Sequence, residues 1–404
     1  MHNARRHDID ALRVLLFALL ILYHVGMLYA AEWNWHIKSS YQSEGLQYLM
    51  LLVNRWRMPL LFLISGLAFN FLRRDCTAWT LIRSRSRRVL LPLVLGVLAI
   101  VPIQPYCQGV TNHLVEPGFG AFLLRYYSFQ PWPKDAFDGW QYGFTWNHLW
   151  YLVYLWVYTL VLVALLPALE SPAGRTIRRA VIGLRGGWLL LLPALPKFLA
   201  LSLLGDRYPG TNDLIHDWYQ HALYFSYFLL GYWIATDDGI WQALRALRHR
   251  ALALAVLNWL AYVLIIKHLL NNDSAGWALL GTRFLSGLNT WLWIATVLGW
   301  SAALLNRPFR WLPYANEAVL PWYILHQSLI VAIAFVLVPL RVGPMLEPLA
   351  VIAGTIAGCA LLYEYLIRRS AVLRLLFGLK PRPEAAKRIN PSPAPAFPLS
   401  SDHD

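Results

Sequence analysis

The sequence predicts an all-α membrane protein, a polytopic bundle of about ten transmembrane helices with both termini in the cytoplasm. Three observations predict this fold class. Of the 404 residues, 58% are hydrophobic and only 14% are charged, whereas soluble domains carry about 25% charged residues. Long apolar runs, most of them close to the roughly 20 residues that cross a bilayer, follow one another along the chain. Lys and Arg gather in short clusters between these runs, as they do in membrane proteins.

The expected spans follow the apolar runs in order. They cover residues 11–30, 48–71, 89–105, 148–167, 187–204, 218–235, 250–270, 283–305, 317–340 and 346–367. Residues 1–370 therefore form one transmembrane domain. Residues 371–404 form a cytoplasmic tail rich in Pro and Ala, which we expect to be disordered because such a composition cannot bury a core.

The distribution of basic residues sets the orientation of the spans. With the N-terminus in the cytoplasm, the cytoplasmic segments hold 24 Lys and Arg residues and the outer loops hold five. An odd number of spans would break this alternation. A cleavable signal peptide is the alternative for the first segment, but Asp8, Asp10 and Arg13 crowd its apolar stretch, and we expect no cleavage.

The net charge of +14 would suggest a nucleic-acid partner on a soluble protein. The chain has no zinc-finger pattern, RNP motif or continuous basic face, so we expect no nucleic acid to bind. Three cysteines are too few and too scattered for a disulfide framework. We expect no bound metal or cofactor, and a membrane-lipid environment.

Ionisable side chains inside spans are costly and usually face a partner or a water-filled cavity. In the first span, Arg13 and His24 are eleven residues apart, which is about three helical turns. The two side chains therefore share one face, and Asp10 lies close to the same stripe. Arg13 is expected at the cytoplasmic edge and His24 beyond the midplane. The alternative for His24 is a packing histidine bonded to a neighbouring carbonyl.

The other candidates lie on three later spans. Arg57 is expected at a depth similar to that of His24, where a cation needs an anion, a dipole or water; the alternative is snorkelling toward the outer headgroups. His148 opens the fourth span at the outer interface, where an aromatic belt is the alternative explanation. Tyr323 and His326 are three residues apart on the ninth span and can face one cavity.

Four motifs combine these residues: Arg13-x10-His24 preceded by Asp10, Arg57-Met-Pro-Leu with Ser65-Gly66, His148-Leu-Trp-Tyr-Leu152, and Tyr323-Ile-Leu-His326-Gln327. In this order, and at these topological positions, they resemble the acyltransferase 3 family of integral membrane enzymes that O-acylate sugars and polysaccharides. The resemblance covers about residues 5–370. The segment Trp35-His36-Ile-Lys-Ser39 and the ending from Leu362 to Pro381 look like the glucan-modifying branch, which includes the succinyltransferase of osmoregulated periplasmic glucans.

Two positions depart from the family pattern. Val319 stands where the family often has Ser, four residues before the motif Tyr. Arg55-Trp-Arg57 stands where the family commonly has Arg-x-x-Arg. A role for Arg55 therefore does not follow from the resemblance.

The resemblance implies an O-acyltransferase of the bacterial inner membrane. It would move a succinyl or acetyl group from cytoplasmic acyl-CoA to a hydroxyl of a periplasmic glucan or another surface polysaccharide. Such transfer needs a base for the hydroxyl, for which His24 is the candidate. Arg57 could stabilise the developing oxyanion or hold the acceptor. Asp10 and Arg13 complete the expected catalytic set at the cytoplasmic mouth.

Further side chains are expected to bind the two substrates: His36, His148, Tyr323, His326, Arg83, Arg85, Arg87 and Arg88. The four arginines lie on the cytoplasmic side and could engage the phosphates of acyl-CoA; the alternative is that they only set the topology. A transporter or flippase for a sugar or lipid-linked substrate is the alternative function. Many transporters show internal repeats, and none is evident in this sequence.

Overall fold

The computed structural model describes residues 6–73, 76–269 and 276–381. All regular elements within these ranges are helical, which confirms the predicted all-α class. The α-helices are α1 (His7–Met27), α2 (Glu44–Arg73), α3 (Ala78–Leu95), α4 (Ile103–Thr111), α5 (Phe119–Tyr126), α6 (Trp150–Leu169), α7 (Pro172–Ile182), α8 (Gly186–Leu191), α9 (Leu195–Leu204), α10 (Trp218–Ile234), α11 (Asp238–Leu269), α12 (Gly276–Leu304), α13 (Leu312–Leu337), α14 (Leu346–Leu361) and α15 (Ala371–Leu376).

Seven helical segments in the described ranges are long and apolar enough to cross a membrane. They are His7–Met27, Glu44–Arg73, Ala78–Thr111, Asn147–Leu169, Gly186–Leu204, Leu312–Leu340 and Leu346–Ile367. The other three expected spans fall on α10, α11 and α12, apart from residue 270, which lies outside the described residues. The chain is thus a polytopic helical membrane protein, while the number of spans and the side of the two termini stay predictions.

The third expected span begins earlier than the apolar pattern indicates. Its helix begins at Ala78, passes through a π-helical turn at Gly96–Ile100, and continues almost directly into α4. The four clustered arginines between residues 83 and 88 therefore lie on α3, with the side-chain directions that a helix imposes.

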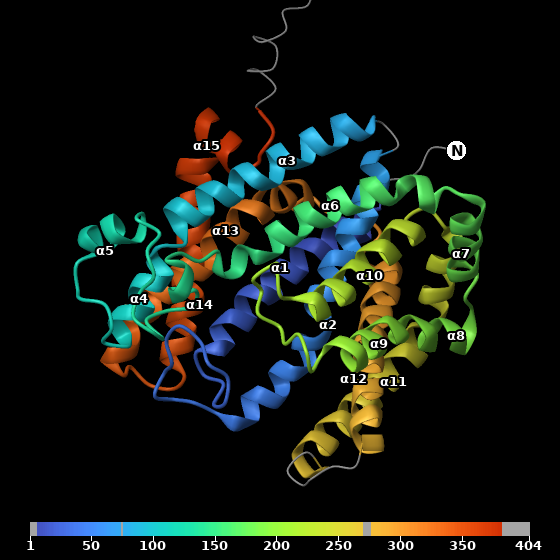
Figure 1. The fold of residues 1–404 in the computed structure, drawn as a ribbon, viewed down its shortest axis with the longest axis horizontal. Coiled ribbons are helices and arrows are strands. Elements are labelled where there is room, and N and C mark those ends of the chain that lie inside the picture. The colour runs from blue at the N-terminus through green and yellow to red at the C-terminus, as the bar shows by residue number, and fades with distance from the viewer. Residues whose placement is uncertain (1–5, 74–75, 270–275, 382–404) are drawn as a thin grey trace, which may run out of the picture.

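Helix α1 lies in the middle of the bundle, in contact with α2, α12, α13 and α14 (Figure 1). Beside it, α2 and α10 approach closely through two glycines. A Cβ on Gly66 would lie 1.9 Å from the carbonyl oxygen of Phe228, and a Cβ on Gly231 would lie 2.0 Å from that of Leu63. Small residues permit such close helix packing in membranes, and this contact holds the helix that carries Arg57.

The connection between α4 and α6 folds around its own apolar cluster, which contains Phe122, Tyr126, Trp132 and Phe137. The hydroxyl of Tyr126 donates to the carbonyl oxygen of Thr145 at 3.3 Å and accepts from its backbone N–H at 3.1 Å. Burial raises the pKa of Tyr126 to about 12, so the phenol stays protonated and can make both bonds. This packing fixes the segment that leads into α6.

Part of the expected tail is helical. Residues 371–376 form α15, which contacts α3. Nη1 of Arg374 donates to Oε1 of Glu317 on α13 at 2.8 Å. Residues 382–404, which make up the rest of the expected disordered tail, lie outside the described residues.

Candidate active site

His24, near the end of α1, and His326, on α13, form a hydrogen-bonded pair. Nδ1 of His24 lies 2.9 Å from Nε2 of His326. The ring centroids are 5.1 Å apart and the ring planes differ by only 6°, which suits an in-plane N–H···N bond. The contact between α1 and α13 thus joins two residues that are 302 positions apart.

The protonation of this pair follows from the partners of His326. Its Nδ1 lies 2.7 Å from the carbonyl oxygen of Tyr323 and 3.2 Å from that of Trp322. A carbonyl oxygen can only accept, so Nδ1 of His326 carries the proton and Nε2 of the neutral ring is an acceptor. Nδ1 of His24 must then donate to it. Nε2 of His24 is left unprotonated, which is the state required of a general base.

His148 fixes the same stretch of α13 from the other side. Its Nε2 donates to the carbonyl oxygens of Tyr323 at 3.0 Å and Ile324 at 3.2 Å, and the Tyr323 hydroxyl donates back to the carbonyl oxygen of His148. The free lone pair on Nδ1 of His148 accepts from the Gln104 amide at 3.3 Å. His148 and Tyr323 therefore form a reciprocal clamp that holds the helix turn on which His326 is oriented.

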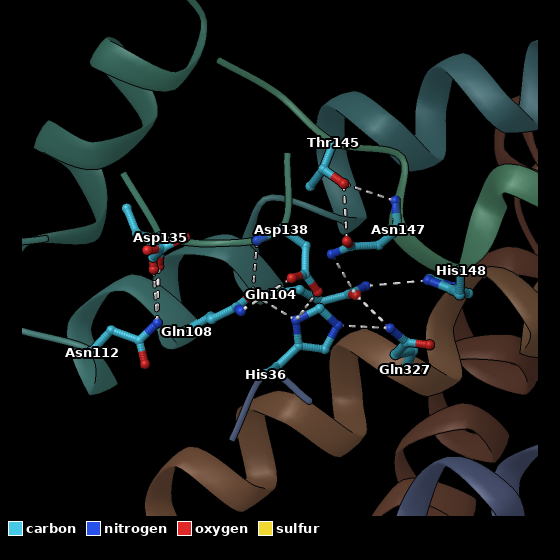
Figure 2. A network of polar contacts seen from close by, with 11 residues as sticks. His36, Gln104, Gln108, Asn112, Asp135, Asp138, Thr145, Asn147, His148 and Gln327 are labelled. Carbon is cyan, nitrogen blue, oxygen red and sulfur yellow. Dashed lines mark hydrogen bonds and ion pairs between the residues drawn. The ribbon is translucent and has the colours of Figure 1, made fainter. Parts of the chain in front are cut away.

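A chain of amide side chains connects this clamp to the outer loops (Figure 2). The amide nitrogen of Gln327 donates to Oε1 of Gln104 and to Nε2 of His36, both at 3.0 Å. Nδ1 of His36 in turn donates to Oε1 of Gln108 at 2.8 Å. The network ties the loop after α1 to α4 and α13.

A cavity of about 1170 Å³ opens beside these residues. We call it the outer cavity, and a second one the inner cavity, after the predicted topology. His24, His36 and His148 all line the outer cavity. Most of the remaining wall consists of aromatic rings, amides and carboxylates: Trp35, Phe137, Trp140, Tyr142, Phe144, Trp146 and Trp150; Asn34, Gln108, Asn112, Gln141, Asn147, Asn212 and Gln327; Asp135, Asp138 and Asp213. Lys38 and His216 also line it. Flat apolar faces beside hydrogen-bonding groups suit a polyhydroxylated ligand.

His326 does not line this cavity, nor a second one that lies beyond Tyr323, and the residue is only 1% exposed. His326 therefore lies behind His24 and borders neither of the two cavities. Its position suits orientation of the base rather than direct contact with a substrate.

Arg57 lies close to the histidine pair without lining either cavity. Its guanidinium stacks 3.6 Å above the ring of Tyr23, and its charge acts on both His24 and His326. Nε and Nη1 are buried and have no hydrogen-bond partner within the described part of the chain. An unsatisfied buried donor is costly, so the N–H groups on these two nitrogens suit an anion or a developing oxyanion.

A second, inner cavity of about 470 Å³ lies on the other side of Tyr323. Asp10, Arg13, Arg85 and Arg88 all line it. Nε and Nη2 of Arg85 are buried and have no partner among the described residues. Orphaned guanidinium donors in a basic cavity fit a phosphate-bearing ligand.

The four expected arginines of α3 therefore separate into two pairs. Arg85 and Arg88 are three residues apart on the helix and line the inner cavity, whereas Arg83 and Arg87 do not line it. Arg13 and His24 also separate, since the first lines the inner cavity and the second the outer one.

Aromatic side chains form the wall between the two cavities. The ring of Tyr323 meets Phe17 edge-on at 5.3 Å and Tyr151 at 6.0 Å. All three rings line the inner cavity, while the backbone oxygen of Tyr323 accepts from His326 and His148 on the outer side. A single residue of α13 thus contacts both halves of the site.

Two further residues, Gln104 and Gln108, complete the amide network and were not predicted from the sequence. Their only signal in the sequence is that two amides stand close together beside an otherwise apolar run. Helix α4 buries both, with Gln104 fully inaccessible. In the described ranges, no group of three or more His, Cys, Asp or Glu residues could hold a metal ion.

Comparison with known proteins identifies the family. The sequence model of the acyltransferase 3 family, described as an acyltransferase domain, matches residues 6–364. The chain belongs to this family. This membership supports an acyltransferase over the transporter or flippase alternative.

Individual curated relatives share little sequence identity with the chain. Over 161 residues, the chain is 26% identical to glucans biosynthesis protein C of Escherichia coli strain K12, which covers 39% of this chain and 38% of that protein. It is 27% identical over 169 residues to the protein of the same name from Salmonella paratyphi B, covering 40% and 39%. The match thus spans under half the length of these relatives. No solved structure gives a significant match.

Proposed function

We propose that this protein is an O-acyltransferase of the bacterial inner membrane. It takes a short acyl group, succinyl or acetyl, from cytoplasmic acyl-CoA and transfers it to a hydroxyl of a periplasmic glucan or a similar surface polysaccharide. The observation that carries the proposal is the unprotonated Nε2 of His24 at the outer cavity. The names of the relatives support a glucan acceptor.

With His24 as the one base, every proton in the reaction is accounted for. A sugar hydroxyl in the outer cavity gives its proton to Nε2 of His24, and its oxygen attacks the thioester carbonyl. Arg57, whose Nε and Nη1 have no partner among the described residues, would supply positive charge and donors to the carbonyl oxygen as negative charge develops on it. Collapse of the intermediate breaks the carbon–sulfur bond, and the His24 imidazolium returns its proton to the departing thiolate. The products are the sugar ester and free CoA.

His326 contributes to this reaction through the lone pair on its Nε2. When His24 becomes an imidazolium, Nδ1–H donates to Nε2 of His326 at 2.9 Å, and a hydrogen bond from a charged donor is stronger than one from a neutral donor. The pair thus stabilises the positive charge as it forms. In this respect His326 occupies the place that a carboxylate takes in a serine hydrolase triad.

The inner cavity is suited to the donor. Acyl-CoA carries several phosphate charges, and Arg13, Arg85 and Arg88 supply positive charge with free donors on Arg85. The thioester would have to pass the ring of Tyr323 to reach His24. The basic lining of the inner cavity supports acyl-CoA as its ligand, and the aromatic and amide lining of the outer cavity supports a carbohydrate.

The test compares strains with and without the gene. Ester-linked acyl groups would be measured by mass on periplasmic glucans and surface polysaccharides, with the deletion complemented by the wild type, His24→Asn or His113→Asn. His113 is an exposed histidine outside both cavities and serves as the matched control. We expect esters on one glycan with the wild type and His113→Asn, and none with His24→Asn. An acyl difference on a lipid or protein instead of a glycan would reject the substrate, and full activity of His24→Asn would reject the mechanism.

A further inference from the structure

The two cavities carry opposite charge, although the chain as a whole is strongly basic. Arg6, Arg13, Arg85 and Arg88 line the inner cavity, with Asp10 as its single carboxylate. Among the described residues, the wall of the outer cavity has three carboxylates, Lys38 as its one Lys or Arg, and His216, which pairs with Asp213. A net negative wall on a protein of formal charge +14 is an unexpected local arrangement and affects which ligand can enter.

Lys38 does little to offset this negative charge. Its ammonium group donates to the backbone carbonyls of Met27 at 2.8 Å, Trp33 at 3.0 Å and Ala30, which occupies all three of its N–H groups. The carbonyls at the end of α1 form the negative end of the helix dipole, which a cation compensates. Burial also lowers the pKa of Lys38. Its positive charge is thus directed into the protein.

Two of the three carboxylates remain open to a ligand. The side chain of Asp138 is 65% exposed, with its Oδ2 3.5 Å from Nδ1 of His36 (Figure 2). Asp135 is exposed in the same loop, where its backbone oxygen accepts from Asn112 at 3.1 Å. Asp213 differs from them, since its carboxylate accepts from His216 and from two backbone N–H groups.

We propose that the outer cavity selects its acceptor by charge, and that Asp135 and Asp138 are the residues that set this selection. Uncharged sugar chains can hydrogen-bond to the carboxylates and stack on the aromatic rings, whereas chains with carboxylate or phosphate groups are repelled. Such repulsion is a common source of specificity, because it weakens binding of the wrong ligand without requiring tighter binding of the right one. This inference rests on the proposed acyl transfer to a sugar and narrows its substrate class to neutral glycans.

The test measures a ratio of two acceptors. The full chain in proteoliposomes, with acyl-CoA on the inner side, would acylate a neutral gluco-oligosaccharide or the same oligosaccharide with one primary alcohol oxidised to a carboxylate. Two unit charges about 4 Å apart in water change an equilibrium about fivefold. We therefore expect kcat/KM to favour the neutral sugar by about fivefold to tenfold in 0.01 M salt. The preference should nearly vanish in 1 M salt, where the Debye length falls from about 30 Å to about 3 Å.

The variants identify the residues responsible. In Asp135→Asn/Asp138→Asn, the low-salt preference should fall to about twofold or less, while Glu116→Gln, which removes an exposed loop carboxylate outside the cavity, should keep it. Because the readout is a ratio, a general loss of activity in the double variant does not affect it, and the salt dependence of the wild type is an independent measurement. Equal acylation of both sugars in 0.01 M salt, or a preference unchanged in the double variant, overturns the inference. Absence of ester on either sugar overturns the proposed function itself.

Discussion

Replacing His326 separates a positioning role from a substrate-binding role. His326→Leu removes the acceptor of the His24 Nδ1–H bond and leaves an apolar side chain in a fully buried place. His326→Gln keeps one acceptor for His24 and one donor for the carbonyl of Tyr323. We expect the leucine variant to lose turnover and the glutamine variant to recover much of it.

The size of the loss follows from the geometry. The bond is 2.9 Å long and partly buried, and its donor becomes charged during the proposed reaction. Hydrogen bonds to charged groups contribute about 1.5–3 kcal/mol, and each 1.36 kcal/mol is a factor of ten in rate. The kcat of His326→Leu should therefore fall about 10-fold to 150-fold. Because His326 lines neither cavity, KM for donor and acceptor should change little.

The assay is transfer of a radiolabelled acyl group from acyl-CoA to glucan in proteoliposomes, with each variant first shown to insert and purify like the wild type. Two results would refute the reasoning. One is wild-type turnover in His326→Leu. The other is an equal loss of kcat in the leucine and glutamine variants, since the hydrogen bond would then not account for the effect.

Three further predictions follow. Arg57→Lys should lower kcat at least about tenfold, because an ammonium cannot present two aligned donors as a planar guanidinium does; unchanged turnover would mean that only charge matters there. Arg85→Ala should raise KM for acyl-CoA about tenfold or more, while the exposed Arg87→Ala on the same helix should not, and equal effects would contradict the assignment of the inner cavity. In a chain without its native cysteines, Glu116→Cys should react with an impermeant maleimide in intact cells and Arg179→Cys only after permeabilisation; the reverse labelling would invert the predicted topology.

Local patterns made much of the fold predictable. Apolar runs long enough to cross a bilayer specify helices, because in lipid the backbone must satisfy its own hydrogen bonds. The third span shows the limit of this argument, since its helix extends back through polar residues to Ala78. Hydropathy does not register a helix that continues into the aqueous boundary. Once this stretch is known to be helical, its 3.6-residue period explains why Arg85 and Arg88 separate from Arg83 and Arg87.

The candidate site was predictable only in part. The free-energy cost of an ionisable side chain in a membrane is enough to indicate functional roles for His24 and Arg57. The eleven-residue spacing correctly places Arg13 and His24 on one helix face, but it cannot show that a wall around Tyr323 assigns them to different cavities. Gln104 gives almost no signal, because a neutral amide in a span is a modest departure from the apolar pattern.

The amino-acid pattern alone indicates a helical membrane protein with a few ionisable groups inside its spans, because burial cost and helical period are properties of short segments. The meeting of His24 and His326 follows from the packing of the whole chain, since 302 residues separate them and no local rule relates their positions. The same packing sets which ring nitrogen of His24 is unprotonated, because the carbonyl oxygen of Tyr323 fixes the tautomer of His326, and His326 in turn bonds to His24. The packing of α1 against α13 thus sets the chemistry of the site. It joins His24, the hydrogen-bond acceptor His326 and the carbonyl oxygen of Tyr323 in one chain of hydrogen bonds.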